Sequence, residues 1–599
     1  VTDVLQKHAQ TTIFGRQKER EYLSQQLETL RNGGDLPLIF IQGEAGIGKS
    51  RLVADLVEVA KSGGTPYWIG SGEAIEKSTP YLAWRSVFTH FFELEGLSEN
   101  ASPRETEAAQ EQIISYLTKV DSSLAPMAPL LNVVLPFHFP DNEFTAQLSG
   151  EVRANQTHDL CIALFKHVTA NRPHLLIMED AHWLDSASWV LLRLVSRDVP
   201  SLLIVTVMRP VHDPVQPDLA RMLARPKIQK LSLESLPASE IETLICYRLG
   251  VDSLPQEVTR FIRERAEGHP FFSEELAYAL RDNGLITIAD GECRLTPDAG
   301  DLREVNFPDT LDGVIISRID TLPAQEQLLL KVASVIGRIF ALRILRDVHP
   351  VDSDKPKLPE YLSHLQTLDI TPLETPEPDL AYIFKHIITQ EVTYNLLLFA
   401  QRRELHRVVA EWFEHTHTEE MSSFYPLLVH HWRQAENTSK TIEYLGKAGE
   451  QAAGLGANQE VITFLSEALE LNKKELHITD KLVLADWEQK IGYAYLSIGH
   501  IDESIDHFRA ALAYLGRNVP TSQGGYVVGL LAGILRQTIH RLWGSRLGSS
   551  REPQVNLKAA HIFQDLGVAI YHTSNPIAAM YVTVYELNEA EQAPPSGIL

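Results

Sequence analysis

Residues 40–56 of this 599-residue chain read FIQGEAGIGKSRLVADL. The apolar run Leu38–Ile41 leads into this stretch and predicts a short buried strand. Residues 43–50 then fit the pattern G-x-x-x-x-G-K-[ST], and apolar residues at helical spacing follow from Leu52. Such glycines let backbone N–H groups surround an anion, and the helix N-terminus adds its dipole. The stretch therefore predicts a phosphate-binding loop between a strand and a helix.

The loop residues have separate expected roles. We expect Lys49 to reach the β and γ phosphates of a bound nucleotide and the Ser50 hydroxyl to bind Mg²⁺. Only about 0.02 chance matches to this pattern are expected in a chain of this length, so a glycine-rich turn without a ligand is the weaker interpretation. The predicted nucleotide-binding residues of the loop are Gly43, Glu44, Ala45, Gly46, Ile47, Gly48, Lys49, Ser50 and Arg51.

Two carboxylates end a second apolar run, residues 175–178, and these are Glu179 and Asp180. Residues at the carboxyl end of a parallel strand lie on the ligand side of the sheet. There one carboxylate can hold Mg²⁺ while its neighbour orients the attacking water. The sequence predicts a magnesium site made by Ser50, Glu179 and Asp180, and it leaves the division of roles between the two carboxylates open.

Further strands are expected at residues 65–69, 202–207 and 228–231. Arg209 follows the second of these strands, where it could sense the γ phosphate. A surface arginine after a strand is an equally good interpretation from position alone. We take Lys49, Glu179, Asp180 and Arg209 as the candidate catalytic residues.

The composition narrows the class of partner. The chain has 54 basic and 78 acidic residues and a net charge of −24, without a concentrated basic patch, which argues against nucleic acid or an anionic membrane as a partner. The most lipid-like run, residues 526–535, is too short to span a bilayer. Three scattered cysteines argue against a disulfide framework and suit the cytoplasm. Because the chain begins at Val1 and stops after a helical pattern, we expect a piece of a larger protein.

Longer motifs resemble one family. Residues 14–19 read FGRQKE, residues 179–185 read EDAHWLD, and residues 267–276 read EGHPFFSEEL. With the phosphate loop, these motifs resemble the signal-transducing (STAND) P-loop ATPases. They are most similar to the Orc1-like AAA ATPase module that follows the catalytic domain in many multidomain adenylate/guanylate cyclases.

This resemblance implies further contacts to ATP or ADP. It places Phe14, Gly15 and Arg16 near the adenine, and Pro270 against the base. His269 stands where the family usually has asparagine. The motif around Phe384-Lys385-His386 implies that His386 touches the β phosphate of ADP, although a hydrogen-bonded packing histidine is an alternative.

We expect an α/β P-loop NTPase fold, a parallel sheet with flanking helices, followed by three helical regions. The expected domains are a linker (1–12), the ATPase core (13–236), a helical lid (237–290), a winged-helix-like domain (305–415) and TPR-like helical repeats (416–599). A polar stretch, 290–308, marks the boundary before the winged helix, for which strands are expected at 370–373 and 380–384.

The winged helix could read DNA, but its third helix, LPEYLSHLQTL at 358–368, contains no lysine or arginine. The repeats are expected as helix pairs at 439–456 with 457–471 and at 481–499 with 500–516, and a plain helical bundle is the alternative. Stacked helix pairs leave a concave binding face, so we expect a protein partner or effector there, and possible nucleotide-dependent oligomerisation.

The sequence therefore favours an ATP-binding and slowly hydrolysing regulatory switch with ATP or ADP and Mg²⁺ as its cofactors. A cyclase catalytic domain, if the parent protein has one, is expected outside these residues. The alternatives are a nucleotide-binding scaffold without turnover, the regulator of a transcription or kinase effector outside this chain, and an Orc-like DNA loader, against which the charge argues.

Overall fold

The computed structural model describes residues 12–94, 103–148, 150–210, 216–297, 302, 308–376, 379–418, 421–475, 480–543 and 553–592. The linker expected at 1–12 therefore lies almost wholly outside the described residues. The chain forms two compact units. The first contains 1–145, 157–421 and 430–436, and the second contains 146–156, 422–429 and 437–599.

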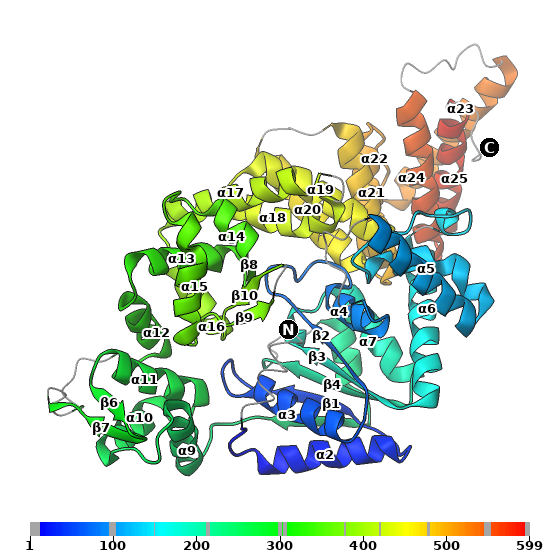
Figure 1. Ribbon diagram of the computed structural model, residues 1–599. Coiled ribbons are helices and arrows are strands. Elements are labelled where there is room, and N and C mark those ends of the chain that lie inside the picture. Colours follow the sequence, from blue (N-terminus) through cyan, green and yellow to red (C-terminus); the bar gives the residue numbers. More distant parts are fainter. Residues whose placement is uncertain are drawn as a thin grey trace. The chain divides into compact units, whose positions relative to one another are not determined.

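The first unit contains a five-stranded parallel sheet (Figure 1). Its order is β2-β3-β4-β1-β5. Because β4 lies between β1 and β3, the carboxyl ends of these three strands are neighbours. The phosphate loop follows β1, Glu179 ends β3, and Arg209 follows β4. The strands are β1 (Leu38–Gln42), β2 (Tyr67–Ser71), β3 (His174–Glu179), β4 (Leu202–Met208) and β5 (Ile228–Ser232).

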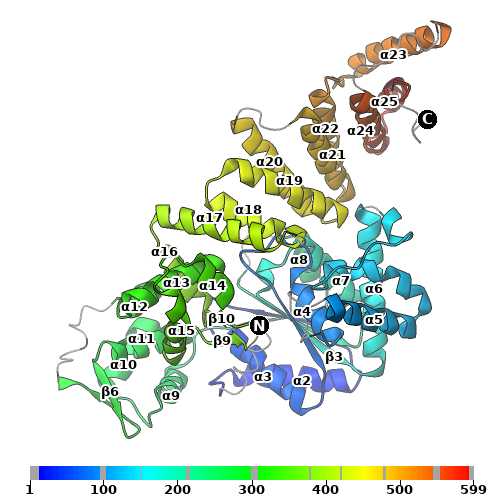
Figure 2. The same ribbon diagram turned by 45° about the horizontal axis from the view of Figure 1, so that its top comes forward.

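Helices cover both faces of this sheet (Figures 1 and 2). On one face, α2 (Gln17–Arg31) and α3 (Lys49–Ser62) pack their apolar sides on β1, β3 and β4. The other face carries α4 (Leu82–Phe91) and α7 (Ser186–Asp198). The remaining elements of this region are α5 (Pro103–Val120), the 3₁₀ helices Ser122–Val133, Thr145–Gln147 and Ala181–Trp183, α6 (Gly150–Asn171) and α8 (Pro217–Leu223).

Three helices and a hairpin follow β5. These are α9 (Ala238–Leu249), α10 (Gln256–Ala266), α11 (Pro270–Asp282), β6 (Ile286–Ala289) and β7 (Glu292–Leu295). The expectation that 290–308 is only a polar boundary is wrong at its start, because β7 pairs antiparallel with β6. Asp290 and Gly291 have φ values of 54° and 79°, and this pair at positive φ makes the tight turn that joins two strands.

A winged-helix arrangement comes next, with a three-stranded antiparallel sheet of order β8-β10-β9. The expected strand at 370–373 begins three residues later, since Asp369 at φ 61° first reverses the chain after α15. The sequence also missed β8. The elements are α12 (Leu311–Asp320), α13 (Ala324–Ile336), β8 (Ile339–Ala341), α14 (Leu342–Val348), the 3₁₀ helix Lys355–Lys357, α15 (Leu358–Thr367), β9 (Leu373–Thr375), β10 (Ala381–Ile383), α16 (Ile387–Asn395) and α17 (Phe399–Thr416).

The second unit is built from helices. Gly449 faces Leu465 and Gly492 faces Phe508, and at each glycine an added Cβ would lie within 2.8 Å of the facing side chain. Two consecutive helix pairs therefore approach closely at matching positions. The helices are α19 (Thr438–Gly454), α20 (Asn458–Lys474), α21 (Lys481–Ser497), α22 (Ile501–Tyr514), α23 (Gln523–Trp543), α24 (Pro553–Tyr571) and α25 (Pro576–Ala590), after the 3₁₀ helix Met421–Phe424 and α18 (Tyr425–Gln434), which crosses from one unit to the other.

The predicted fold class is confirmed, with a parallel sheet and flanking helices followed by a largely helical remainder. In the part of the chain that the structure describes, no helix is both long and apolar enough to cross a membrane.

A buried histidine on α6 gives a prediction about acid stability. The ring of His158 shares a 2.9 Å hydrogen bond with the hydroxyl of Tyr81. Burial, and then the charge of Arg193, lower the pKa of His158 to about 4. The unfolded chain therefore binds a proton before the folded protein does, so stability is lost as the pH falls from 6.5 towards 4. At pH 5, the low pKa of His158 lowers the free energy of unfolding by about 2 kcal/mol.

Between pH 7 and pH 5, we expect the free energy of unfolding of His158→Gln to fall by about 2 kcal/mol less than that of the wild type. The reason is that glutamine can form a hydrogen bond with Tyr81 without taking up a proton. Urea denaturation at the two pH values measures the difference. The control is His167→Gln, an exposed site on the same helix, which should follow the wild type. An equal acid loss in His158→Gln and wild type would contradict the prediction.

Candidate nucleotide-binding site

Glycines shape the loop between β1 and α3. Gly46 and Gly48 have φ values of 78° and 101°, in the left-handed region that side chains disfavour. A Cβ on Gly46 would also lie 2.9 Å from atoms of His269 and Phe271. The loop therefore requires glycine at Gly46 both for its conformation and for the close approach of α11.

Lys49 begins α3 and is only 8% exposed. Its Nζ donates hydrogen bonds to the carbonyl oxygens of Gly43 at 2.8 Å and Glu44 at 2.7 Å. Burial lowers the pKa of Lys49, and the charges of Asp180 and Glu179 oppose that shift. The loop's own carbonyls thus hold the ammonium group beside the cradle that the glycines form.

Glu179 ends β3 and is 5% exposed. Burial first, and then the charge of Asp180, raise the pKa of Glu179 to about 7. Among the described residues, its Oε1 atom has no hydrogen-bond partner. A buried carboxylate oxygen without a partner, with the Ser50 hydroxyl close by, is a suitable ligand for a hard cation such as Mg²⁺. The residues present therefore fit a magnesium nucleotide.

Asp180 has a left-handed backbone, with φ 46°. Its Oδ2 accepts a 3.2 Å hydrogen bond from Nη1 of Arg338, which lies just before β8. Both side chains are less than one-third exposed. Arg338 comes from the winged-helix region, so a residue far along the chain reaches the carboxylate at the end of the ATPase strand.

The segment before α2 lies at the same pocket. Arg16 donates to the carbonyl oxygens of Ile47, at 3.2 Å, and Glu234. The ring of Phe14 contacts the ring of Tyr247 on α9, with centroids 5.4 Å apart. These contacts tie the start of the described chain to the phosphate loop and to the helices after the sheet.

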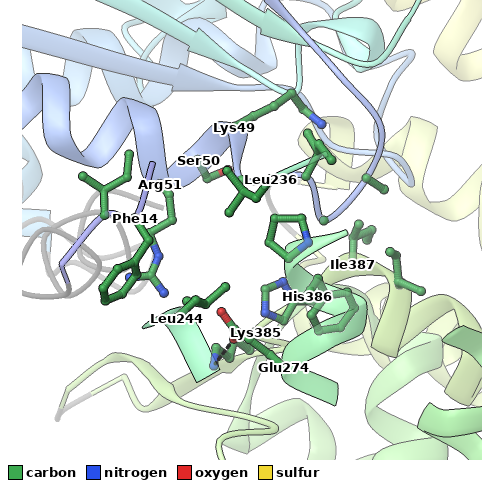
Figure 3. Close-up of a pocket in the computed structure, with 18 of the residues that line it drawn as sticks. Phe14, Lys49, Ser50, Arg51, Leu236, Leu244, Glu274, Lys385, His386 and Ile387 are labelled. Carbon is green, nitrogen blue, oxygen red and sulfur yellow. Dashed lines mark ion pairs between the residues drawn. The ribbon is translucent and has the colours of Figure 1, made fainter. Parts of the chain in front are cut away.

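Residues at the start of α11 contact the phosphate loop. The His269 ring lies 3.0 Å from the Ala45 carbonyl through Nε2, and its Nδ1 accepts the backbone N–H of Phe272 at 3.2 Å. It therefore caps α11 as asparagine would. The ring of Phe271 contacts the ring of His386, with centroids 3.8 Å apart and the two planes tilted by 35°. His386 stands just before α16, and Figure 3 shows it beside Lys385 and Glu274 at the pocket.

Arg209 lines the same pocket and forms a 3.5 Å ion pair with Glu391 of α16. Most of the residues expected at the site line one pocket, and these are the phosphate loop from Ala45 to Arg51, the two carboxylates, Arg209, Phe14, Arg16, Pro270 and His386. Gly15, Gly43 and Glu44 do not line it, although Gly43 and Glu44 hold Lys49 through their carbonyl groups.

Four further pocket residues carry no motif that predicts their role. Arg338, Arg248, Glu274 and Lys385 also line the pocket. Arg248 pairs with Glu274 at 3.1 Å, and Lys385 lies 3.9 Å from the same carboxylate. Lys385 was part of a quoted motif without a role. Arg338 comes immediately before β8, and this position beside a strand was the available signal, but β8 itself was not predicted.

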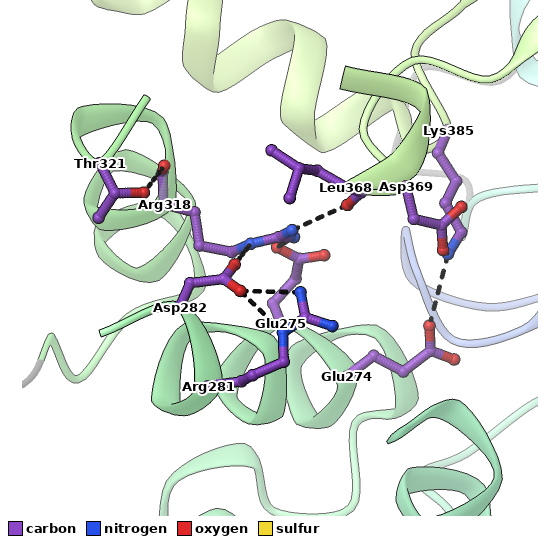
Figure 4. Close-up of polar contacts among 9 residues, drawn as sticks. All are labelled: Glu274, Glu275, Arg281, Asp282, Arg318, Thr321, Leu368, Asp369 and Lys385. Carbon is purple, nitrogen blue, oxygen red and sulfur yellow. Dashed lines mark hydrogen bonds and ion pairs between the residues drawn. The ribbon is translucent and has the colours of Figure 1, made fainter. Parts of the chain in front are cut away.

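A buried ionic network joins α11 to the winged-helix region (Figure 4). Arg318 of α12 donates to Glu275 at 2.7 Å, to Asp282 at 3.3 Å and to the Leu368 carbonyl at 3.1 Å. Arg318 and Glu275 are each 6% exposed. Removing one partner of such a buried group would leave the other charge uncompensated, so the network holds these elements together.

A phosphate loop between a strand and a helix, in a parallel sheet with two carboxylates at the end of β3, defines a P-loop nucleotide-binding fold. Residues 12–207 match the family model of the AAA ATPase domain, and residues 237–294 match a domain of unknown function, DUF8739. The segment 12–207 is therefore an AAA ATPase domain, which occupies about a third of the chain.

Several known proteins are similar to the chain. Adenylate cyclase type 10 of Oryctolagus cuniculus is 20% identical over 377 residues, which are 56% of this chain and 23% of that protein. The Homo sapiens protein of that name is 19% identical over 377 residues, with the same coverage. An uncharacterized protein of Rhizobium meliloti (strain 1021) is 24% identical over 464 residues, 73% of this chain and 40% of that protein. The chain thus spans less than half the length of these relatives.

Among solved structures, a Signal Transduction ATPase with Numerous Domains (STAND) protein with a tetratricopeptide repeat sensor from Pyrococcus horikoshii has a TM-score of 0.41. It is 11% identical, and the match covers 97% of this chain and 77% of that one. The Aeropyrum pernix ORC1 protein in complex with DNA has a TM-score of 0.27 at 13% identity, covering 65% and 94%. The family match confirms the AAA ATPase domain of the predicted resemblance, and adenylate cyclases are among the curated relatives, as that resemblance implies.

Proposed function

We propose that this chain is an ATP-binding and slowly hydrolysing regulatory switch within a larger protein, such as an adenylate/guanylate cyclase. One observation carries the proposal. The pocket of the phosphate loop is lined by residues of the ATPase core, of α11 and of the winged-helix region, such as Lys49, Pro270 and His386. A nucleotide in this pocket would contact all three, so its phosphates could bias their packing.

The side chains of the pocket have separate proposed roles in ATP binding and hydrolysis. Mg²⁺, bound with the nucleotide, would neutralise charge at the β and γ phosphates. Ser50 and the buried Glu179 would supply oxygen ligands for that ion. Lys49 places its ammonium group beside the phosphates, and Asp180 orients the attacking water and draws on its proton. Phe14, Arg16 and Pro270 would position the base and sugar.

Two ion pairs supply the differential contacts that a switch needs. Asp180 is paired with Arg338, and Arg209 with Glu391. In each pair, a charged side chain with a proposed role in ATP hydrolysis, Asp180 or Arg209, forms an ion pair with a residue outside the ATPase core. ATP hydrolysis needs Asp180 and Arg209 to turn to water and the γ phosphate, so the two pairs favour a state with low turnover.

Replacing Arg338 with alanine is therefore expected to raise the turnover of ATP. A partly exposed ion pair contributes about 1 kcal/mol, which corresponds to an increase of about fivefold. Steady-state phosphate release at saturating ATP measures the effect. The control is Arg346→Ala, an exposed arginine on α14, which should leave turnover unchanged. Equal or lower turnover in Arg338→Ala would contradict an inhibitory role for this pair.

The helical second unit is the proposed receiver of a protein partner or effector signal, and nucleotide-dependent oligomerisation is a further proposed output. The proposed location is the cytoplasm. A scaffold without turnover is the main alternative, and the same assay separates the two. Phosphate release that is lost in Lys49→Ala supports the switch, whereas tight ATP binding without phosphate release supports the scaffold.

The affinity for DNA distinguishes the proposed switch from an Orc-like DNA loader. The helix α15 carries no lysine or arginine between Leu358 and Thr367, so we expect no DNA affinity that falls steeply with salt. Fluorescence anisotropy with duplex DNA across a range of salt concentrations tests this point.

A further inference from the structure

Three histidines of the first unit lie together away from the nucleotide pocket. His406 belongs to α17, while His430 and His431 belong to the C-terminal part of α18. His406 and His431 are 1% and 0% exposed, and His430 is half-buried. One ring nitrogen of each histidine lies within 4.8 Å of a ring nitrogen of the others. Among the described residues, this is the one group of potential metal ligands that meets such a limit.

The rings are spaced as they would be around a single ion. Their centroids are 5.5 Å apart for His406 and His430, 5.1 Å for His406 and His431, and 5.3 Å for His430 and His431. Zinc binds imidazole nitrogen at about 2.0–2.1 Å with tetrahedral geometry, which places the centres of three bound rings about 5.2 Å apart. The three measured separations lie close to that value.

Hydrogen bonds orient two of the rings. The Nδ1 atoms of His406 and His431 are 2.8 Å apart, and His406 Nε2 lies 2.9 Å from the hydroxyl of Tyr394. If Nε2 of His406 donates to Tyr394, its Nδ1 keeps a free lone pair, as metal-binding histidines do when their second nitrogen is held. An ion would replace the bond between the two Nδ1 atoms after they separate by a few tenths of an ångström.

His431 supplies an independent sign of an incomplete site. Its Nε2 atom is buried and has no hydrogen-bond partner among the described residues. A fully buried imidazole with an unpaired nitrogen is costly, because the group has lost its water without gaining a partner. Coordination through Nε2 would give this nitrogen the partner that it lacks.

The ligand set indicates the class of ion. The cluster offers imidazole nitrogens and no carboxylate oxygen. The positive charges of Arg402 near His406, and of Arg433 and Lys77 near His430, disfavour the protonated imidazolium forms and therefore keep the rings neutral, as metal coordination requires, although they also repel a cation. Magnesium and calcium require oxygen ligands, whereas zinc, copper, nickel and cobalt accept neutral imidazole. The half-buried His430 gives the ion a route to the site.

We propose that His406, His430 and His431 bind a zinc-class transition-metal ion, with a fourth position open to water or another ligand. The ion would join α17 to the C-terminal part of α18 and so stabilise this pair of helices against unfolding. This proposal does not depend on ATP hydrolysis.

Zinc titration of the untagged, metal-stripped full chain against a chromophoric chelator tests the site. We expect one zinc ion per chain by elemental analysis after gel filtration, with an upward shift of the thermal midpoint. Cobalt should give the visible absorption of a tetrahedral nitrogen-bound ion. His430→Gln, at the half-buried position, should weaken zinc binding at least tenfold, and Tyr394→Phe should weaken it less, since it removes only a supporting hydrogen bond.

Circular dichroism and ATP affinity check that both variants are folded. The matched control is His561→Gln, an exposed histidine of α24, which should bind zinc as the wild type does. Either of two results would overturn the proposal. One is a wild-type chain that retains no zinc, cobalt, nickel or copper through gel filtration. The other is a folded His430→Gln variant that binds zinc with wild-type affinity.

Discussion

The variant Lys49→Ala is expected to bind ATP at least about 100-fold more weakly than the wild type, with phosphate release reduced to background. Its Nζ lies in the loop beside the glycine cradle, held by two backbone carbonyls. Each hydrogen bond from a charged group contributes about 1.5–3 kcal/mol, so the loss of two phosphate contacts corresponds to at least about two powers of ten in affinity. Titration calorimetry with magnesium ATP measures the change.

The control for this variant is Lys61→Ala. Lys61 is exposed in the last turn of the same helix, α3, and should not affect the affinity. Because Lys49 is buried in a site that desolvates its charge, its removal should not unfold the domain, and thermal denaturation checks this. ATP affinity within threefold of the wild type in a folded Lys49→Ala would remove the nucleotide-binding role from the loop.

The second large effect is expected at the strand-end carboxylates. Asp180→Asn keeps the shape of the side chain but cannot draw a proton from water, so we expect ATP turnover to fall by about 100- to 1,000-fold. ATP affinity should stay within a few-fold, because Asp180 is not proposed to hold the phosphates. Single-turnover hydrolysis, with affinity measured separately, distinguishes the two effects. Wild-type turnover in Asp180→Asn would show that the assignment is wrong.

Glu179→Gln separates the roles of the two carboxylates. If Glu179 holds the ion, this variant should need more Mg²⁺ for half-maximal turnover, whereas Asp180→Asn should keep the wild-type magnesium requirement. The control is Asp198→Asn at the end of α7, a carboxylate that does not line the pocket. A magnesium requirement that shifts in Asp180→Asn and not in Glu179→Gln would reverse the assignment.

Much of the site could be predicted because its parts are short segments with a local physical cause. The loop needs glycine where φ is positive, and Gly46 and Gly48 meet that need. Glu179, Asp180 and Arg209 follow apolar strands, and the carboxyl ends of parallel strands meet at one edge of a sheet. The phosphate end of the pocket therefore followed from local pattern and one rule of topology.

Other elements were missed or misplaced where the local signal is weak. The hairpin of β6 and β7 was hidden in a polar stretch, although Asp290-Gly291 is a strong turn signal. The strand β8 has three residues, too few for an alternating pattern, and so Arg338 beside it had no apparent role.

The sequence by itself determined that a phosphate loop, two carboxylates and a helical remainder occur in this chain, because each is encoded within a few neighbouring residues. Only the tertiary structure decided which distant side chains meet them. Arg338 and Asp180 are 158 positions apart, and His406 and His431 are 25 positions apart on different helices. Such pairs arise from the packing of whole elements, which depends on the summed burial of many side chains and leaves no pattern at either residue.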